Sequence, residues 1–401
     1  MWKWTAALLA ALLMFTDLIV NIVSVRYLGL DLVGLALLNS LWTIVFIPVA
    51  RISSNLADRG VARRQAALGA ALLVASQLLL YLSLALSSVP VLFLAYAVEA
   101  VSFPFVRLGI QAGLLESVPS ERWGVENRYM LARQLLFESL VLLSVSRIGL
   151  RAFSFTYLPG ATAATALVGA LAALTLPEPS VRIERTLSRF QSLMNRALVT
   201  ARGVLEITSL DFSGLSSANL VLAPVPGPRI GLPLIFLGLA GFRISNEYLF
   251  TPLPYFLVVT RGLPSDVVLA VYGVSKLISI APLLLTPSNS TSPGFLALAL
   301  ALRLASVFAI VALAPGPIAM AVILSLVYYS NAVIDSSLYA LFVEAMSGYG
   351  VGLYSIAGKV SSLVGTLTSG YVMVAFGPWA VVAAAAAASL LGAPLVTRPR
   401  G

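Results

Sequence analysis

The chain has 401 residues, of which 59% are hydrophobic and 10% are charged, and its mean hydropathy is +0.97. A soluble globular domain has about 25% charged residues, so this composition predicts a polytopic membrane protein. The chain has no cysteine and no histidine, which excludes disulfides, thiolate catalysis and Cys/His metal centres. We expect neither a metal nor another cofactor.

The net charge of +9 comes from basic residues in short segments between apolar stretches. This arrangement indicates membrane topology rather than a DNA-binding face, so we expect no nucleic-acid partner.

Apolar stretches of about 20 residues, the length that spans a bilayer as a helix, recur along the whole chain. The first contains Asp17 and is too long for a typical signal-peptide core, so we interpret it as an uncleaved transmembrane helix. The prediction is an all-α membrane protein with about twelve transmembrane helices. They lie near residues 4–26, 33–53, 66–87, 90–114, 127–147, 157–176, 231–258, 267–286, 294–314, 317–342, 351–374 and 377–396.

The second and third predicted helices are joined by a short basic turn, Ser54–Leu68. A turn this short makes the flanking helices antiparallel neighbours. It resembles the loop between the second and third helices of the major facilitator superfamily, whose pattern is Gly-x-Leu-Ala-Asp-Arg-x-Gly-Arg-Lys. Four residues match in place, namely Leu56, Ala57, Asp58 and Arg59, and the basic pair Arg63 and Arg64 matches with one residue inserted. Taken without the resemblance, the turn is an ordinary positive-inside loop.

The distribution of Lys and Arg predicts the orientation. If the N-terminus is cytosolic, sixteen basic residues fall in cytosolic segments and only four in outer loops, namely Arg26, Arg147, Arg151 and Arg261. This bias predicts a multi-pass protein of the cell membrane with both termini in the cytoplasm.

One long loop divides the chain into three predicted regions. They are an N-terminal six-helix bundle at 1–176, a cytosolic central loop at 177–230 and a C-terminal six-helix bundle at 231–401. Apolar residues in Val181–Arg202 recur at helical intervals with arginines between them, which indicates an amphipathic basic helix on the cytosolic leaflet. A solvated connector helix fits the same pattern. Residues 206–229 are rich in Pro and Gly near their end and are expected to be irregular.

A weak internal repeat supports two halves. Glu116 and Gly124 are spaced as Glu344 and Gly352 are, which places the halves in register at an offset of 228 residues (344 − 116). Together with the basic turn and the central loop, this repeat resembles the major facilitator fold over nearly the whole chain.

Ten charged residues fall inside the predicted helices. A charge in a bilayer costs roughly 2.5–3.5 kcal/mol on insertion scales, so such residues face a cavity or a partner. They are Asp17, Glu99, Arg107, Glu138, Arg243, Glu247, Lys276, Arg303, Asp335 and Lys359. Six of the ten lie on the first, fourth, seventh and tenth helices, and the resemblance implies that these four helices line a central cavity.

Residues four apart share a helix face. Three such polar pairs occur on these helices, namely Asp17 with Asn21, Arg243 with Glu247, and Asn331 with Asp335. The predicted cavity for substrate and proton contains Asp17, Asn21, Glu99, Arg243, Glu247 and Asn331. Some of these residues could instead form permanent ion pairs between helices. Tyr248, Tyr255 and Tyr328 could stack on a ligand, although ordinary packing explains them equally. Arg107 and Asp335 differ by the repeat offset, so we predict that they form a gate across the cytosolic side; the alternative is that Arg107 pairs within its own half, for example with Glu138.

The resemblance implies a secondary active transporter that moves a small organic solute by alternating access. It also implies proton coupling, with Asp17 or Glu99 as proton carrier, because desolvation favours the protonated form of a carboxylate. The helix 2–3 motif is frequent in exporters of the family, which favours efflux. The expected partners are the solute, protons and the lipid bilayer, and we expect a monomer. No Walker loop, nucleophile elbow or metal-ligand cluster occurs in the sequence, so we predict neither an enzyme nor a nucleotide-driven pump. A non-transporting receptor or scaffold on the same fold is the alternative.

Overall fold

The computed structural model describes residues 1–58, 61–118, 122–177, 232–286, 292–313, 315–345 and 351–392. All regular secondary structure in these ranges is helical. The N-terminal half contains α1 (Trp2–Arg26), α2 (Leu32–Asp58), α3 (Ala62–Ala85), α4 (Val89–Ser117), α5 (Trp123–Ile148), α6 (Leu150–Ala152), the π-helical segment η2 (Phe153–Tyr157) and α7 (Leu158–Thr175). The C-terminal half contains α9 (Leu232–Phe250), α10 (Leu253–Tyr255), the π-helical segment η3 (Phe256–Thr260), α11 (Ser265–Leu285), α12 (Pro293–Ala312), α13 (Pro317–Ala345) and α14 (Val351–Leu390).

The helices correspond to the predicted spans. Ten helices of the described part of the chain are long and apolar enough to cross a membrane. One of these, α14, contains two spans, because Gly377 (φ 77°, ψ 179°) breaks the helical path just before Pro378. The seventh predicted span is α9 with α10 and η3, in which Arg243, Asn246 and Glu247 lower the hydropathy. The predicted all-α fold is therefore confirmed, while the domain boundaries at 176 and 230 stay predictions.

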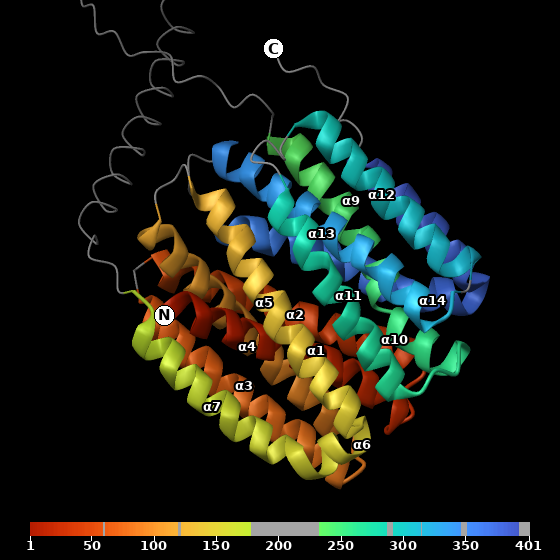
Figure 1. Ribbon diagram of the computed structural model, residues 1–401, viewed down its shortest axis with the longest axis horizontal. Coiled ribbons are helices and arrows are strands. Elements are labelled where there is room, and N and C mark those ends of the chain that lie inside the picture. Colours follow the sequence, from red (N-terminus) through yellow and green to blue (C-terminus); the bar gives the residue numbers. More distant parts are fainter. Residues whose placement is uncertain are drawn as a thin grey trace, which may run out of the picture.

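The two halves of the chain lie side by side (Figure 1). The interface between them is formed by α2 packing against α14 and by α5 packing against α11. The helices farthest from this interface are α3 and α7 on one side and α12 on the other, as Figure 1 shows. This arrangement leaves α1, α4, α9 and α13 to surround the centre.

We call the end of the molecule that holds the start of α1 and the basic turn between α2 and α3 the basic end. Here α1 begins and α7 ends, with the hydroxyl oxygens of Thr5 and Thr175 2.8 Å apart (Figure 1). Lys3 forms an ion pair with Glu126 at 2.7 Å at the same end.

The basic turn between α2 and α3 lies at the basic end as well. Leu56 and Ala57 belong to the last turn of α2, and Arg64 is exposed. The Arg63 Nε atom donates a hydrogen bond to the Leu176 carbonyl at 2.6 Å, which holds the start of α3 against the end of α7. Arg59 and the side chain of Asp58 lie outside the described residues, and so does the predicted amphipathic helix at 181–202.

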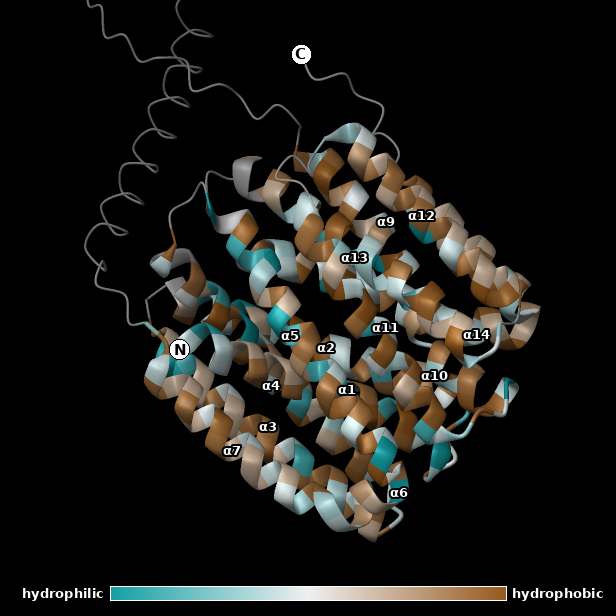
Figure 2. Ribbon diagram, viewed as in Figure 1, coloured by the Kyte–Doolittle hydropathy of each residue, from teal (hydrophilic) through white to brown (hydrophobic). Residues whose placement is uncertain are grey.

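Large apolar side chains cover the outside of the bundle. Leu174, Phe376 and Leu298 are 73%, 74% and 63% exposed. Figure 2 shows hydrophobic residues along most of α3, α7 and α12, with hydrophilic residues among the helices between the two halves. Soluble monomers rarely expose apolar surface on this scale, whereas lipid tails solvate it.

Small residues let neighbouring helices approach closely. A Cβ atom on Gly69 of α3 would lie 2.6 Å from Val106 Cγ2 and 2.9 Å from the Val106 backbone nitrogen of α4. A Cβ atom on Gly365 of α14 would lie 2.7 Å from Glu247 Cβ of α9. Close backbone approach at small residues is typical of helix packing in membranes.

We therefore expect Gly69→Ala to lower the midpoint of thermal unfolding in detergent, with a loss of about 1–3 kcal/mol from overpacking. The matched control is Gly160→Ala, because Gly160 is also helical and a Cβ atom added there would meet no atom within 4 Å. Both substitutions gain the same intrinsic helix propensity, so their difference isolates the contact with α4. Equal midpoints for the two variants would contradict the packing argument.

Candidate functional site

A polar cavity of about 280 Å³ lies between the two halves. Residues of α1, α2 and α4 line it on one side, and residues of α9, α11, α13 and α14 line it on the other. The polar and aromatic residues of its wall are Asp17, Asn21, Asn39, Trp42, Thr43, Tyr96, Phe103, Arg243, Asn246, Glu247, Phe250, Thr251, Tyr272, Lys276, Tyr328, Lys359 and Thr366.

On the N-terminal side, a hydrogen-bond network surrounds Asp17. The Tyr96 hydroxyl donates to Asp17 Oδ1 at 2.5 Å and accepts from Asn21 Nδ2 at 3.1 Å. Asn39 Nδ2 donates to Asn21 Oδ1 at 2.8 Å. The network joins α1, α2 and α4, and the described residues offer Asp17 no ion-pair partner. Its carboxylate thus accepts a hydrogen bond from one neutral donor, the Tyr96 hydroxyl, next to the cavity.

On the C-terminal side, Arg243 of α9 forms an ion pair with Asp335 of α13 at 2.5 Å. The Tyr354 hydroxyl donates to Asp335 Oδ1 at 2.9 Å, which connects the pair to α14. Glu247, one turn after Arg243, accepts a hydrogen bond from the Thr251 hydroxyl at 3.0 Å. Within the described residues, Glu247 has no ion pair.

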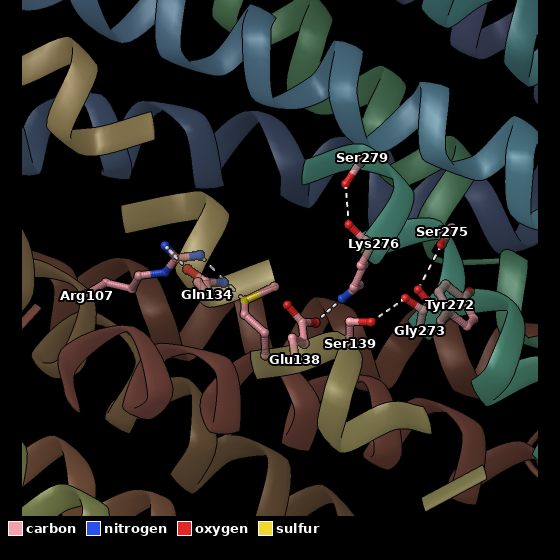
Figure 3. Close-up of polar contacts among 10 residues, drawn as sticks. Arg107, Gln134, Glu138, Ser139, Tyr272, Gly273, Ser275, Lys276 and Ser279 are labelled. Atoms are coloured by element: carbon pink, nitrogen blue, oxygen red, sulfur yellow. Dashed lines mark hydrogen bonds and ion pairs between the residues drawn. The ribbon is translucent and has the colours of Figure 1, made fainter. Parts of the chain in front are cut away.

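Another ion pair at the cavity joins the two halves, unlike the pair of Arg243 and Asp335. Lys276 of α11 is bonded to Glu138 of α5, and the two side chains are only 6% and 1% exposed. Figure 3 shows their charged groups pointing toward each other, with Ser139 donating to the Gly273 carbonyl beside them at 2.7 Å. Lys276 also lies over the Tyr328 ring, 5.2 Å from its centroid. These contacts tie α5 to α11 at the level of the cavity.

Lys359 of α14 has different surroundings from the other two cavity cations. Its Nζ atom lies 4.4 Å from the Trp42 ring centroid, 5.5 Å from that of Phe46 and 6.0 Å from that of Phe103. No described residue forms an ion pair with it. Lys359 therefore reaches from the C-terminal half into an aromatic site of the N-terminal half.

Two predicted cavity residues do not line the cavity. Glu99 lies on α4, one turn from Tyr96 and from Phe103, and is fully buried. Neither of its carboxylate oxygens has a hydrogen-bond partner in the part of the chain that the structure describes. Asn331 of α13 is also absent from the cavity wall, and its Oδ1 is buried without such a partner.

The structure brings Asp17, Asn21, Arg243 and Glu247 of the predicted set to one cavity. Their roles stay predictions. Tyr328 also lines the cavity, whereas Tyr248 bonds to Thr368 and Tyr255 packs in the apolar core. Sequence reasoning found Lys276 and Lys359 as charges within the membrane but did not assign them to the site. It missed Asn39, Trp42, Tyr96 and Phe103, although the polar Asn39 in an apolar helix was a usable signal.

Arg107 and Asp335, the predicted gate, are not bonded to each other in this structure. Arg107 Nη1 donates to Gln134 Oε1 at 3.2 Å and its guanidinium lies over the Phe103 ring, while Asp335 is bonded to Arg243 (Figure 3 shows Arg107 and Gln134). In this structure Arg107 contacts residues of its own half, and both the gate and its alternative stay predictions. Its partner there is Gln134 rather than Glu138, because Glu138 is taken by Lys276.

Arg303, one of the charges inside the predicted helices, has no ion pair among the described residues. The side chain is fully buried and donates to neutral groups, the Ser245 and Ser389 hydroxyls at 2.7 and 3.1 Å and Asn246 Oδ1 at 2.7 Å. It joins α12 to α9 and α14 outside the cavity, so its role is structural.

A larger hollow, of about 1030 Å³, lies at the end of the molecule opposite the basic end. Its arginines, Arg26 and Arg151, are exposed to solvent. Unlike the central cavity, it lacks a network of buried polar side chains. We therefore place the candidate site in the central cavity.

No protein-family model and no curated protein sequence matches this chain. Solved structures do match it over almost its whole length. A D-xylose–proton symporter has a TM-score of 0.69 and 14% identity, with 99% of this chain and 97% of that chain covered. The xylose transporter XylE from E. coli in an inward-open conformation has a TM-score of 0.64 and 14% identity, covering 100% and 96%. A peptide transporter, POT, has a TM-score of 0.62 and 15% identity, covering 98% and 93%. The likeness confirms the predicted major facilitator fold.

Proposed function

We propose that this protein is a secondary active transporter that moves a small organic solute across the cell membrane by alternating access, with the monomer as the working unit. The observation that carries the proposal is the central cavity, to which both halves contribute charged residues at the level of the membrane. The similar structures are of a proton symporter for D-xylose, a xylose transporter and a peptide transporter, and this supports the same class of function. Carriers of this fold bind solute between two halves that rock against each other.

The packing of the helices is compatible with such a motion. At the end opposite the basic end, α1 packs against α10 and η3 of the other half. Toward the basic end, Asp335 is bonded within its own half, and its side chain is 44% exposed. The halves thus meet at one end, while a central charge toward the other end is accessible to solvent.

Proton coupling is the second part of the proposal, with Asp17 and Glu99 as proton carriers. Burying a carboxyl group without a partner disfavours its charged form, and Glu99 is buried in this way. Asp17 lies on the cavity wall, and Tyr96, three residues before Glu99, is bonded to it. Asp17 is therefore the proposed group for exchange with the cavity, and Glu99 is the proposed inner group.

The alternative function is a receptor or scaffold that binds a ligand without moving it. A thermal-shift screen of sugars, di- and tripeptides and organic amines on the purified protein would identify ligands, because a ligand that binds the native state raises its apparent stability. We expect a ligand found in this way to cross the membrane of proteoliposomes faster than that of protein-free liposomes. Binding without flux under any imposed gradient would favour the receptor.

The proposed orientation places the basic end in the cytosol. The chain has no native cysteine, so single cysteines can report accessibility at two exposed positions, Asn55 at the basic end and Ser87 at the opposite end. In intact cells we expect an impermeant maleimide to label Ser87→Cys and not Asn55→Cys. Ser265 is a poorer reporter of the outer side because it is only 8% exposed. Outside labelling of Asn55→Cys alone would reverse the orientation.

The gate is proposed as an exchange of partners. Arg107 has a neutral partner, Gln134, and the Asp335 side chain is 44% exposed, so Asp335 could leave Arg243 for Arg107 when the basic end closes. Spin labels at Ser117 of α4 and Ala345 of α13 would report that closure. We expect Arg107→Ala to shift the distance distribution toward longer values, and Arg107→Asp with Asp335→Arg to restore part of it. The control is Arg133→Ala, whose guanidinium lies over Trp4 within the N-terminal half. An unchanged distribution in Arg107→Ala would end the gate hypothesis.

A further inference from the structure

The three cations that line the cavity, Lys276, Arg243 and Lys359, have unequal partners. Lys276 is bonded to Glu138, and Arg243 is bonded to Asp335. The third cation, Lys359, has no ion pair among the described residues, and its ammonium group lies against aromatic rings instead. A lysine that needed only charge neutralisation would be expected beside a carboxylate.

The rings around Lys359 form a cage with walls in two orientations. Trp42 and Phe46 of α2 are stacked, with centroids 5.2 Å apart and planes at 16°. Phe103 of α4 stands edge-on to Trp42 at 5.0 Å and 83°. We call Trp42, Phe46 and Phe103 the aromatic cage. Ring faces attract cations through their quadrupole, most strongly for Trp, and such cages bind organic ammonium groups in other proteins.

When Asp17 is deprotonated, the cavity has an excess of unpaired negative charge. Asp17 and Glu247 both line it, one from each half, and both are bonded to neutral hydroxyl groups rather than to cations. Against these two carboxylates stands Lys359, the one cation of the cavity wall without an ion pair among the described residues. Arg107 does not line the cavity; it lies over Phe103 and is hydrogen-bonded to Gln134. A ligand with a single positive charge would bring these groups to balance, whereas an anionic ligand would increase the excess.

We propose that the aromatic cage is a subsite for a monovalent organic ammonium group of the solute, and that Lys359 occupies this subsite until the solute displaces it. This inference rests on the proposed transport function, and it names the chemical class of the solute. Glu247 and Asp17 line the same cavity as Lys359, so the displaced ammonium group has acidic groups to approach. The long flexible stem of lysine allows this movement while α14 stays in place.

Choline and its neutral isostere 3,3-dimethyl-1-butanol are suitable probes, because they share a shape and differ in charge. We would measure the binding of each to the purified full-length protein in detergent by calorimetry. The dissociation constant for choline is expected to be lower than that for the alcohol in the wild-type protein. In Lys359→Met, which removes the competing ammonium group and keeps a flexible apolar side chain of similar length, choline should bind about tenfold more tightly, which corresponds to 1.4 kcal/mol.

Two further variants separate the cage from a general effect of charge. Lys3→Met removes a lysine at the basic end and should leave the choline affinity at its wild-type value. Adding Trp42→Leu to Lys359→Met should abolish the gain. If Lys359→Met does not elute as a folded protein in gel filtration, Lys359→Gln replaces it. If the addition of Trp42→Leu causes this failure, Phe103→Leu replaces Trp42→Leu.

Several outcomes would overturn the inference. These are equal binding of choline and the alcohol, an unchanged or weaker choline affinity in Lys359→Met, or a gain that survives Trp42→Leu. In the second case Lys359 would only hold α2 against α14. Flux of a neutral solute without choline binding would remove the cage subsite and keep the transport function. Choline binding in the cage without choline flux into proteoliposomes would keep the subsite and remove transport.

Discussion

The Glu138→Gln variant is expected to lose roughly 3–5 kcal/mol of unfolding free energy, because it leaves the Lys276 ammonium group buried without its counter-ion. The two side chains are 1% and 6% exposed, so water cannot replace the lost partner. The pair lies where α5 packs against α11, between the two halves of the molecule. We expect the midpoint of thermal unfolding in detergent to fall more for this variant than for Gly69→Ala.

The double variant Glu138→Gln with Lys276→Met tests the physical reason. Removing both charges takes away the uncompensated ion, so the double variant should be more stable than Glu138→Gln alone. Lys3→Met is the control, since Lys3 and Glu126 are about a quarter exposed (27% and 26%) and such a pair contributes about 0–1 kcal/mol. A double variant less stable than Glu138→Gln would show that the charges do not act through each other.

The Asp17→Asn variant is expected to lose gradient-driven uptake of the solute and to keep its expression and fold. Asparagine retains an acceptor for the Tyr96 hydroxyl, so the network among α1, α2 and α4 should survive. It cannot exchange a proton, so an imposed pH gradient should no longer drive accumulation. Exchange of solute between equal concentrations, which needs no net proton movement, should persist.

The measurement is uptake into proteoliposomes of a ligand found by the thermal-shift screen, with and without a pH gradient. Asp31→Asn is the matched control, because Asp31 lies outside the cavity and Asn can also accept the hydrogen bond from the Gly34 backbone. Wild-type rates with unchanged pH dependence in Asp17→Asn would remove this residue from the mechanism and would leave Glu99 to be tested in the same way.

The positions of the transmembrane helices were predictable from the sequence because each span must satisfy the bilayer independently of its neighbours. The prediction of two spans at 351–374 and 377–396 illustrates this. The structure has α14 there, and its helical path is broken at Gly377. In the sequence, the pair Gly377-Pro378 marks this break. The charges inside the membrane were equally visible, since they stand out in apolar surroundings.

The partners of those charges were not predictable, because they depend on how each helix is rotated and which helix faces it. In this structure Asp335 is bonded to Arg243 in its own half, a partner that the sequence did not indicate, while its contact with Arg107 on closure stays a prediction. Glu99 and Tyr96 differ by three residues on one helix, and only Tyr96 reaches the cavity. A rotation of one helix by part of a turn would exchange such roles without any change in the sequence.

The sequence by itself determined a membrane protein of about twelve helices in two halves, with both acidic and basic groups within the membrane. Hydropathy is a property of each segment, and a bilayer selects for it one segment at a time. Only the tertiary structure decided that Lys359 faces Trp42, Phe46 and Phe103 while Lys276 faces Glu138. The aromatic cage is built from α2 and α4, and its cation comes from α14, near the other end of the chain. No local pattern records that contact, because it exists only once the two halves have packed together.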